Sequence, residues 1–464
     1  MKNFDYSTYL SPFTWRYGSE EMRKIWSEIN KRKIWRRIWV ELAKAQHEKG
    51  LVSKKELEDI IKHKDNIDID KAGEIEKKIR HDLMAEIKTY AQQAKIGGGK
   101  IHLGATSYDI EDNAETIRFK ESLSLIEKKL KNLLKIFCKK IKEYKDLPCM
   151  AYTHLQPAEP TTLGYRFCVY AQDIILDLNL LNFVKENLKG KGIKGAVGTS
   201  ASYVSLMDEK DAQNMEKKIM DNLRIESIDI ATQVAPRKIE YFISSLLSSI
   251  AQSLNKLAMD IRIMQSPGFG EWQEPFGEKQ VGSSAMPFKK NPWKSEQICS
   301  LSRIILNLSN ISKENAAYML LERTLDDSAN RRIYLPEIFL ATDEILTTAI
   351  NILGGIIINK NNIEKNLNMY GPFAITEAVL MNAVKNNANR QEMHELLRKI
   401  SMLAWEDIQK NGTNPLIKLI TTNKTITGFI DSDKLKSLLD PKRHVGLALQ
   451  KCLNFLKKAD ELSN

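Results

Sequence analysis

The chain has 464 residues, enough for roughly two to four domains and a large buried core. Its formal net charge is +11, but the lysines are spread along predicted helices and form neither a condensed tail nor a groove lined with aromatic side chains. The composition therefore argues against nucleic-acid binding, and leaves an anionic small molecule or a solvated lysine-rich surface as explanations of the charge.

The cysteines and the N-terminal residues indicate in which cellular compartment the protein is expected. The five cysteines are odd in number and form no Cys-x-x-Cys pair, which indicates reduced thiols in a cytoplasmic protein. Asp5, Glu20 and Glu21 lie near the start, where a signal peptide would be apolar. The most apolar uncharged stretches, 241–255 and 345–359, are shorter than the ~18 residues of a membrane span. We therefore expect a soluble protein without a membrane partner.

Helical periodicity dominates the chain. Proline is scarce, with 13 in all and none from 161 to 235, and apolar residues recur at helical spacing over long runs. The predicted helices, in chain order, are 19–48, 74–95, 113–146, 162–189, 236–265, 292–313 and 334–353. A helix of about 30 residues is ~45 Å long. These lengths predict an all-α protein with a long central helical bundle.

Domain boundaries are expected where the composition changes. Near Asp112 a glycine-rich, polar segment gives way to a long periodic helix, and 359–368 is rich in Asn and Lys. We therefore predict three domains: an N-terminal helical domain (1–112), a central long-helix bundle domain (113–364) and a C-terminal helical domain (365–464).

Two glycine-rich segments imitate nucleotide-binding loops. Gly190-Lys-Gly-Ile-Lys-Gly195 matches G-x-G-x-x-G, but it follows a helical run, whereas a dinucleotide fingerprint needs a strand, a turn and a helix. Residues 97–100 lack the Ser/Thr and the spacing of a P-loop. Neither these segments nor any metal-ligand spacing predicts a cofactor or a metal ion.

The most informative segment is 282–292, Gly-Ser-Ser-Ala-Met-Pro-Phe-Lys-Lys-Asn-Pro. Its hydroxyls, lysine and amide lie between turn residues with little apolar content, so it is predicted to be a mobile polar loop. Pro292 should begin a helix with Asn291 as its cap, and a helix N-terminus favours an anion. The alternative is a Ser/Gly linker with a chance lysine.

Three of the seven histidines, His81, His102 and His154, lie in polar, turn-like contexts. His154 is flanked by hydroxyls and amides between connections broken by proline, where a general acid could be presented. The other four histidines are interpreted as ordinary core or surface residues.

The segment 282–292 resembles the signature loop of the fumarase/aspartase superfamily of lyases. Further segments are similar, in the same order, to the adenylosuccinate lyase family; they are Arg80–Asp82, Ile101–Ser107, Thr153–Pro157, Gly192–Thr199, Thr232–Arg237, Glu322–Arg332 and Leu439–Pro441. The resemblance covers nearly the whole chain. It implies a three-domain, all-α fold and a β-elimination that releases fumarate from adenylosuccinate, giving AMP, and from succinylaminoimidazole carboxamide ribotide, in purine nucleotide biosynthesis.

The resemblance also implies catalytic roles. Ser283 would be the base and His154 the acid, with Lys289, Glu296 and His81 completing the catalytic set. A serine is a poor base in water, so the loop would have to close over the substrate, with Lys289 and backbone N–H groups stabilising the alkoxide. Glu296 would pair with His154 and fix its tautomer, unless it is simply a surface glutamate.

The implied substrate-binding residues fall into three groups. The nucleotide phosphate would be held by Arg16, Tyr17, Arg323, Ser328 and Arg332, and the choice of Arg332 over Arg331 rests on alignment alone. The succinyl carboxylates would be held by Thr106, Ser107, Gln233, Lys289 and Asn291. The remaining predicted contacts are His81 and His102 on the phosphate or base side, and Arg80, Asp82, Thr153 and Met286.

The resemblance implies a homotetramer whose active sites each combine the His102, His154 and Ser283 regions of three chains. Phe288 and Lys290 stand where relatives often carry a His or Tyr and an Arg, which leaves substrate preference open. Argininosuccinate lyase, another superfamily lyase and a non-catalytic structural relative are the alternatives. The joint presence of His154, Ser283, Lys289 and Glu296 favours an enzyme.

Overall fold

The computed structural model describes residue 5 and residues 7–463. The chain divides into two compact units. Unit 1 comprises Met1–Lys129, Asp177–Leu254 and Ser300–Thr347, and unit 2 comprises Leu130–Leu176, Asn255–Cys299 and Thr348–Asn464. Positions 112 and 364 both lie inside continuous helices, and the division into three domains stays a prediction.

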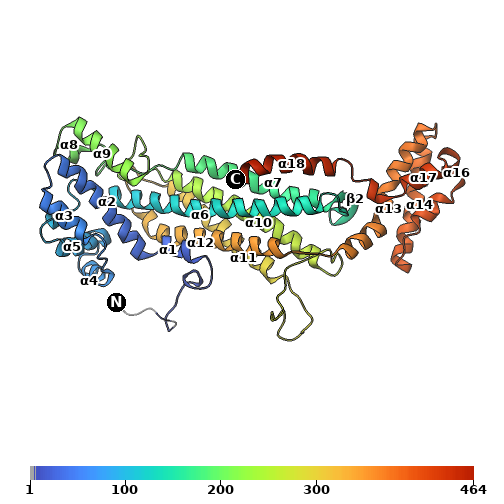
Figure 1. Cartoon of the computed structure of the whole chain (residues 1–464), viewed down its shortest axis with the longest axis horizontal. Coiled ribbons are helices and arrows are strands. Elements are labelled where there is room, and N and C mark those ends of the chain that lie inside the picture. Colours follow the sequence, from blue (N-terminus) through green and yellow to red (C-terminus); the bar gives the residue numbers. More distant parts are fainter. Residues whose placement is uncertain (1–4, 6, 464) are drawn as a thin grey trace. The chain divides into compact units, whose positions relative to one another are not determined.

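The described residues are mainly helical, which confirms the all-α prediction (Figure 1). The first helices are α1 (Glu20–Ile25), α2 (Glu28–Glu48), α3 (Lys54–His63), α4 (Ile69–Ile79), α5 (Asp82–Gln93), α6 (Ser107–Tyr144), α7 (Leu163–Glu186), α8 (Ala201–Val204) and α9 (Glu209–Leu223). They are followed by α10 (Lys238–Gln265), α11 (Trp293–Ala317), α12 (Asp326–Gly355), α13 (Lys360–Lys385), α14 (Arg390–Asn411), α15 (Leu416–Thr421), α16 (Lys424–Phe429), α17 (Ser432–Leu438) and α18 (Ala448–Ser463).

Strands are few and short. β1 (Pro148–Thr153) and β2 (Gln156–Thr162) form an antiparallel hairpin, and β3 (Trp272–Gln273) pairs with β4 (Ile357–Ile358). The hairpin packs against α13 within unit 2. Its turn carries His154, the predicted general acid.

The long predicted helices are confirmed as α6, α7, α10, α11 and α12, with ends that differ by several residues. Two predicted helices are wrong because each is interrupted. The run 19–48 breaks at Ser27, whose side chain accepts a hydrogen bond from the N–H of Asn30 and starts α2. The run 74–95 breaks at Arg80, which takes a left-handed φ of 55° and ends α4.

The polar stretch 359–368, near which a domain boundary is predicted, forms the beginning of α13, and the boundary stays a prediction. Asn359 caps this helix by accepting a hydrogen bond from the N–H of Asn362. Asn is a weak helix former within a helix but a strong N-cap, so a stretch rich in asparagine can begin a helix.

The core of unit 1 forms around α2, which buries Ile34, Trp35, Ile38 and Trp39. These positions recur at helical spacing and face one side of α2. α2 packs against α9, next to which it lies in Figure 1. A separate apolar core in unit 2 joins α13 to α14, α15, α16 and α17.

Two helices, α7 and α12, are long and apolar enough to cross a membrane by length and composition, which the sequence analysis did not predict. The sequence-based prediction considered only uncharged stretches, whereas a helix that includes one or two charged side chains can still be apolar enough on average to pass this test. The most apolar parts of α7 and α12 are 56% and 67% buried inside the protein, as in the core helices of water-soluble folds.

Candidate functional site

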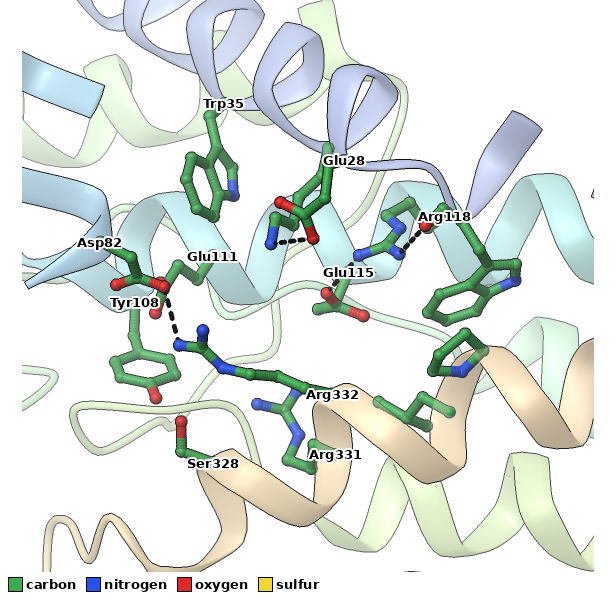
Figure 2. A pocket seen from close by; sticks show the side chains of 14 residues that line it. Glu28, Trp35, Asp82, Tyr108, Glu111, Glu115, Arg118, Ser328, Arg331 and Arg332 are labelled. Atoms are coloured by element: carbon green, nitrogen blue, oxygen red, sulfur yellow. Dashed lines mark hydrogen bonds and ion pairs between the residues drawn. The ribbon is translucent and has the colours of Figure 1, made fainter. Parts of the chain in front are cut away.

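A pocket in unit 1 gathers charged side chains from α2, α5, α6 and α12 (Figure 2). Arg332 donates a hydrogen bond to the Asp82 carboxylate at 2.7 Å, and Ser328 lies one helical turn before Arg332. Burial favours the neutral form of Asp82, but the Arg332 guanidinium and the N–H of Leu83 outweigh burial and hold the pKa of Asp82 below its ordinary value. Two predicted binding residues, Asp82 and Arg332, are thus brought together.

Arg331 and Arg332 differ in their exposure to solvent. Arg331 is buried and donates hydrogen bonds to the Glu240 carboxylate, at 2.9 Å from Nε to Oε1. The side chain of Arg332 is 56% exposed. Arg331 therefore holds α12 against α10, whereas Arg332 pairs with Asp82 and stays accessible to solvent.

Arg323 is positioned by Tyr108 and Asp327. Its guanidinium lies over the Tyr108 ring, 4.3 Å from the ring centroid, and also donates a hydrogen bond to the Tyr108 hydroxyl. A second hydrogen bond, of 2.7 Å, goes to the Asp327 carboxylate. Asp327 is fixed in turn by Arg237 at 2.7 Å, so a buried charged network orients the segment from Arg323 to Ser328.

His102 has a defined protonation state. Burial lowers its pKa to about 4, against the opposing effect of Asp109. Its Nδ1 lies 3.0 Å from Nε1 of Trp39, and the indole nitrogen is always a donor. His102 is therefore neutral near pH 7, with Nδ1 as acceptor and the proton on Nε2, ready to donate.

His81 resembles His102 in its tautomer. It caps α5, and its Nδ1 accepts a hydrogen bond from the N–H of Met84 at 3.3 Å. In the neutral ring the proton is then on Nε2. Arg80, directly before it, has a left-handed φ of 55° and ends α4, so the chain turns between α4 and α5 at these residues.

The other predicted binding residues of unit 1 lie in loops or at helix ends. Arg16 is exposed, with its guanidinium 5.7 Å from the centroid of the Tyr17 ring. Gln233 is half-buried, and its N–H donates to the carbonyl oxygen of Glu322. Thr106 and Ser107 lie at the start of α6, where the N–H of Thr106 donates to the Asp109 carboxylate at 3.0 Å.

In unit 2, His154 lies at the tip of the β1–β2 hairpin. His154 and Leu155 form its two-residue turn, with φ angles of 55° and 61°. Both angles are unusual for residues other than glycine, and such strain is concentrated at functional sites. The hydroxyl of Tyr152, near the end of β1, donates to the buried Glu271 at 3.3 Å. The hairpin thus presents Thr153 and His154 exposed, on an anchored base.

The signature loop, residues 282–291, is mostly exposed. The half-buried Ser283 accepts hydrogen bonds at its Oγ from the N–H groups of Ala285 (3.3 Å) and Met286 (3.1 Å). A Cβ on Gly282 would lie 2.1 Å from the carbonyl oxygen of Lys289, so only glycine allows the two ends of the loop to meet. Ser283 is therefore placed where N–H groups can stabilise a negative charge on its oxygen.

The predicted cap of the following helix is wrong. The buried Glu274 carboxylate accepts hydrogen bonds from the N–H groups of Lys294 and Ser295 at the start of α11. Asn291 instead donates to the carbonyl oxygen of Gly282 at 3.1 Å. A carboxylate already occupies this helix N-terminus, so it is not available to a substrate anion.

The predicted site residues are divided between the two units. His81, His102, Arg323, Ser328 and Arg332 belong to unit 1, and His154, Ser283, Lys289 and Glu296 belong to unit 2. Across the part of the chain that the structure describes, no hydrogen bond or ion pair joins His154 to Glu296 or Ser283 to Lys289. Both pairings stay predictions.

Sequence reasoning missed Tyr108 and Glu111, which line the pocket from α6. Their spacing of three places them on one face of that helix, and this was the available signal. It also left the segment 190–195 without a role. In the structure, the backbone N–H groups of Lys194 and Gly195 donate hydrogen bonds to the buried Asp109 of α6, each at 3.1 Å. The segment is therefore bonded to α6 and has a structural role.

No metal centre emerges from this geometry. Among residues 5 and 7–463, no group of three or more His, Cys, Asp or Glu side chains is placed to hold a metal ion.

Comparison with known families places these observations in context. The lyase family model matches residues 16–306, and the model of the adenylosuccinate lyase C-terminus matches residues 372–452. The chain is 38% identical to an adenylosuccinate lyase of Schistosoma mansoni, covering 97% of this chain and 95% of the relative. It is 36% identical to that of Saccharomyces cerevisiae, covering 98% and 95%. For that of Methanocaldococcus jannaschii the identity is 37%, covering 95% and 94%.

Solved structures agree on the fold. A fumarate lyase from Mesorhizobium sp. BNC1 has a TM-score of 0.83 at 23% identity, covering 97% of this chain and 99% of the other. A 3-carboxy-cis,cis-muconate lactonizing enzyme from Pseudomonas putida has a TM-score of 0.86 at 20% identity, with the same coverage. The likeness in fold, the two family models and the full-length relatives agree, and the chain belongs to the adenylosuccinate lyase family of the fumarase/aspartase superfamily.

Proposed function

We propose that this protein cleaves adenylosuccinate to AMP and fumarate, and succinylaminoimidazole carboxamide ribotide in the same way, within purine nucleotide biosynthesis. The observation that carries the proposal is the match to relatives named adenylosuccinate lyase over nearly the full length of both chains. The C-terminal family model, which matches residues 372–452, favours this activity over argininosuccinate cleavage.

The reaction needs a base, an acid and fixed positive charge. Ser283 Oγ would take the proton from the succinyl carbon next to the carbon that bears the nitrogen, and the electron pair would move into the adjacent carboxylate. The C–N bond then breaks as the double bond of fumarate forms, and His154 gives its proton to the leaving nitrogen. The N–H groups of Ala285 and Met286 at Ser283 Oγ support this role because they would stabilise the alkoxide.

Substrate binding would use both units. Arg16, Tyr17, Arg323, Ser328 and Arg332 would hold the phosphate, since a guanidinium suits phosphate bidentately. The proton on Nε2 of the neutral His102 would be offered to the nucleotide without adding charge. Lys289, with Thr106, Ser107, Gln233 and Asn291, would hold the succinyl carboxylates.

In a homotetramer with shared sites, the His102, His154 and Ser283 regions of three chains would together form each active site. The exposure of His154 and Glu296 in one chain supports this arrangement, because a neighbouring chain could bring a partner to each. A cytoplasmic location is supported by the five cysteines, which are all buried as thiols. No nucleic-acid or membrane partner is part of the proposal.

The test is a spectrophotometric assay of the purified protein that follows the loss of adenylosuccinate absorbance, with argininosuccinate as the competing substrate. We expect turnover of adenylosuccinate alone. Turnover of argininosuccinate instead, or of neither substrate by folded protein, would contradict the proposal and favour another superfamily lyase or a non-catalytic relative.

A further inference from the structure

The pocket of unit 1 contains a carboxyl group without a bonding partner. Figure 2 shows the side chain of Glu111 extending from α6 toward Asp82. Asp82 takes the Arg332 guanidinium at 2.7 Å. Within residues 5 and 7–463, no side chain or backbone group makes a hydrogen bond or salt bridge to the Glu111 carboxyl group.

The surroundings of Glu111 favour its neutral form. Burial is the largest effect, followed by the negative charges of Asp82 on α5 and Asp112 on α6. Arg332 and Arg331 on α12 oppose them, but the pKa of Glu111 is still raised to about 8. Arg331 is committed to Glu240 and Arg332 to Asp82, which explains why two arginines do not ionise this carboxyl group.

The remaining charges of the pocket are paired with each other. Glu28 and Lys31 on α2 form an ion pair of 2.7 Å. On α6, Glu115 pairs with Arg118, also at 2.7 Å. The Tyr108 hydroxyl accepts a hydrogen bond from Arg323. None of these groups offers Glu111 a compensating charge of its own.

We propose that Glu111 is a binding residue that accepts the anionic, phosphate-bearing end of the nucleotide only in its protonated form. This inference rests on the proposed function, in which Arg332 and Ser328 hold the phosphate. A protonated carboxyl group can donate a hydrogen bond to a phosphate or ribose oxygen. An ionised one would repel the phosphate and compete for Arg332.

The direction of the pH dependence follows from this assignment. The protonated form is the one competent to bind, so the apparent affinity is near its maximum at pH 7 and falls as the pH rises through the pKa of about 8. Apparent affinity scales with the competent fraction, so the dissociation constant should rise about tenfold near pH 9. The phosphate itself is already a dianion there, since its second pKa is about 6.

Calorimetry of AMP binding tests the inference with the full-length protein. In two buffers of different ionisation enthalpy at pH 8, the wild-type protein should take up about half a proton per site. Glu111→Gln, which is neutral at every pH, should show no uptake and a dissociation constant that is constant from pH 7 to 9. The matched control is Glu121→Gln, which removes the same charge from α6 outside this pocket and should keep the wild-type pH dependence.

The outcomes are separable. Wild-type binding that takes up no proton at pH 8, or a Glu111→Gln variant that retains the tenfold weakening, would overturn the inference while leaving the proposed function intact. Wild-type protein that binds no AMP at any pH would overturn both. Where the variant fails to fold, wild-type binding without proton uptake at pH 8 would still overturn the inference.

Discussion

At the scale of single residues, three predicted site residues have a left-handed backbone conformation, as do Leu155, Ser200, Arg224, Leu321 and Asn387. Arg80, His102 and His154 all have a positive φ, at 55°, 70° and 55°. For residues with a Cβ this conformation costs about 1–2 kcal/mol each, so each is maintained only where the surroundings fix it. Arg80 ends α4 in this conformation, and at His102 and His154 the strain supports the predicted functional roles.

Ser283→Ala and His154→Ala should each lower kcat by about 10² to 10⁴ with the fold retained, because neither side chain supports the core. Steady-state kinetics and circular dichroism measure the two effects. Ser284→Ala is the matched control, since it removes the neighbouring exposed hydroxyl and should keep wild-type kcat. Ser283→Ala that keeps more than about a tenth of wild-type kcat would exclude Ser283 as the base.

At the scale of elements, the β1–β2 hairpin and the signature loop each carry one predicted catalytic residue, His154 and Ser283. The hairpin is strained at its two turn residues and anchored through Tyr152 and Glu271. The loop is closed at its neck by Gly282 and Asn291 and otherwise makes few contacts. One element should therefore be rigid and the other responsive to substrate.

Leu155→Gly should stabilise the protein by about 1 kcal/mol, because glycine takes a positive φ without the Cβ clash. The same change should lower kcat, since a freer turn holds His154 less firmly. Urea unfolding and steady-state kinetics test the two effects. Leu155→Ala keeps the Cβ and should give no such stabilisation; equal stability of the two variants would argue that the turn is unstrained.

Hydrogen exchange of residues 282–291 should slow when AMP and fumarate are bound, because closure of the loop would exclude water and bring Lys289 to a carboxylate. The core of α11, behind the loop, serves as an internal reference and should be protected in both states. Strong loop protection without ligand, unchanged on binding, would mean that the activation of Ser283 has another origin.

At the scale of the whole molecule, the proposal of a homotetramer with shared sites can be tested by complementation. Mixing inactive His154→Ala and Ser283→Ala chains, after dissociation and reassembly, should restore part of the activity, because some sites would then combine an intact His154 with an intact Ser283. The measurement is kcat per tetramer against the mixing ratio. Mixed tetramers verified by mass that recover no activity would show that each chain builds its own site.

The sequence by itself determined the all-α class, the long helices and the family, because each rests on local signals. Apolar spacing of 3.6 identifies a helix without knowledge of its partners, and the eleven residues from Gly282 to Pro292 are contiguous. The breaks at Ser27 and Arg80 were missed, since a helix interruption without proline or glycine leaves little trace in the pattern.

Only the tertiary structure decided which charged groups are free to act. Arg331 and Arg332 are identical and adjacent in sequence and both line the pocket, but Arg331 is buried and bonded to Glu240, 91 residues away, whereas the side chain of Arg332 is half exposed and paired with Asp82. The tautomer of His102 is set by Trp39, and the start of α11 is capped by Glu274 in place of Asn291. Burial and electrostatic pairing depend on distances between residues remote in sequence, and these distances exist only once the chain has folded.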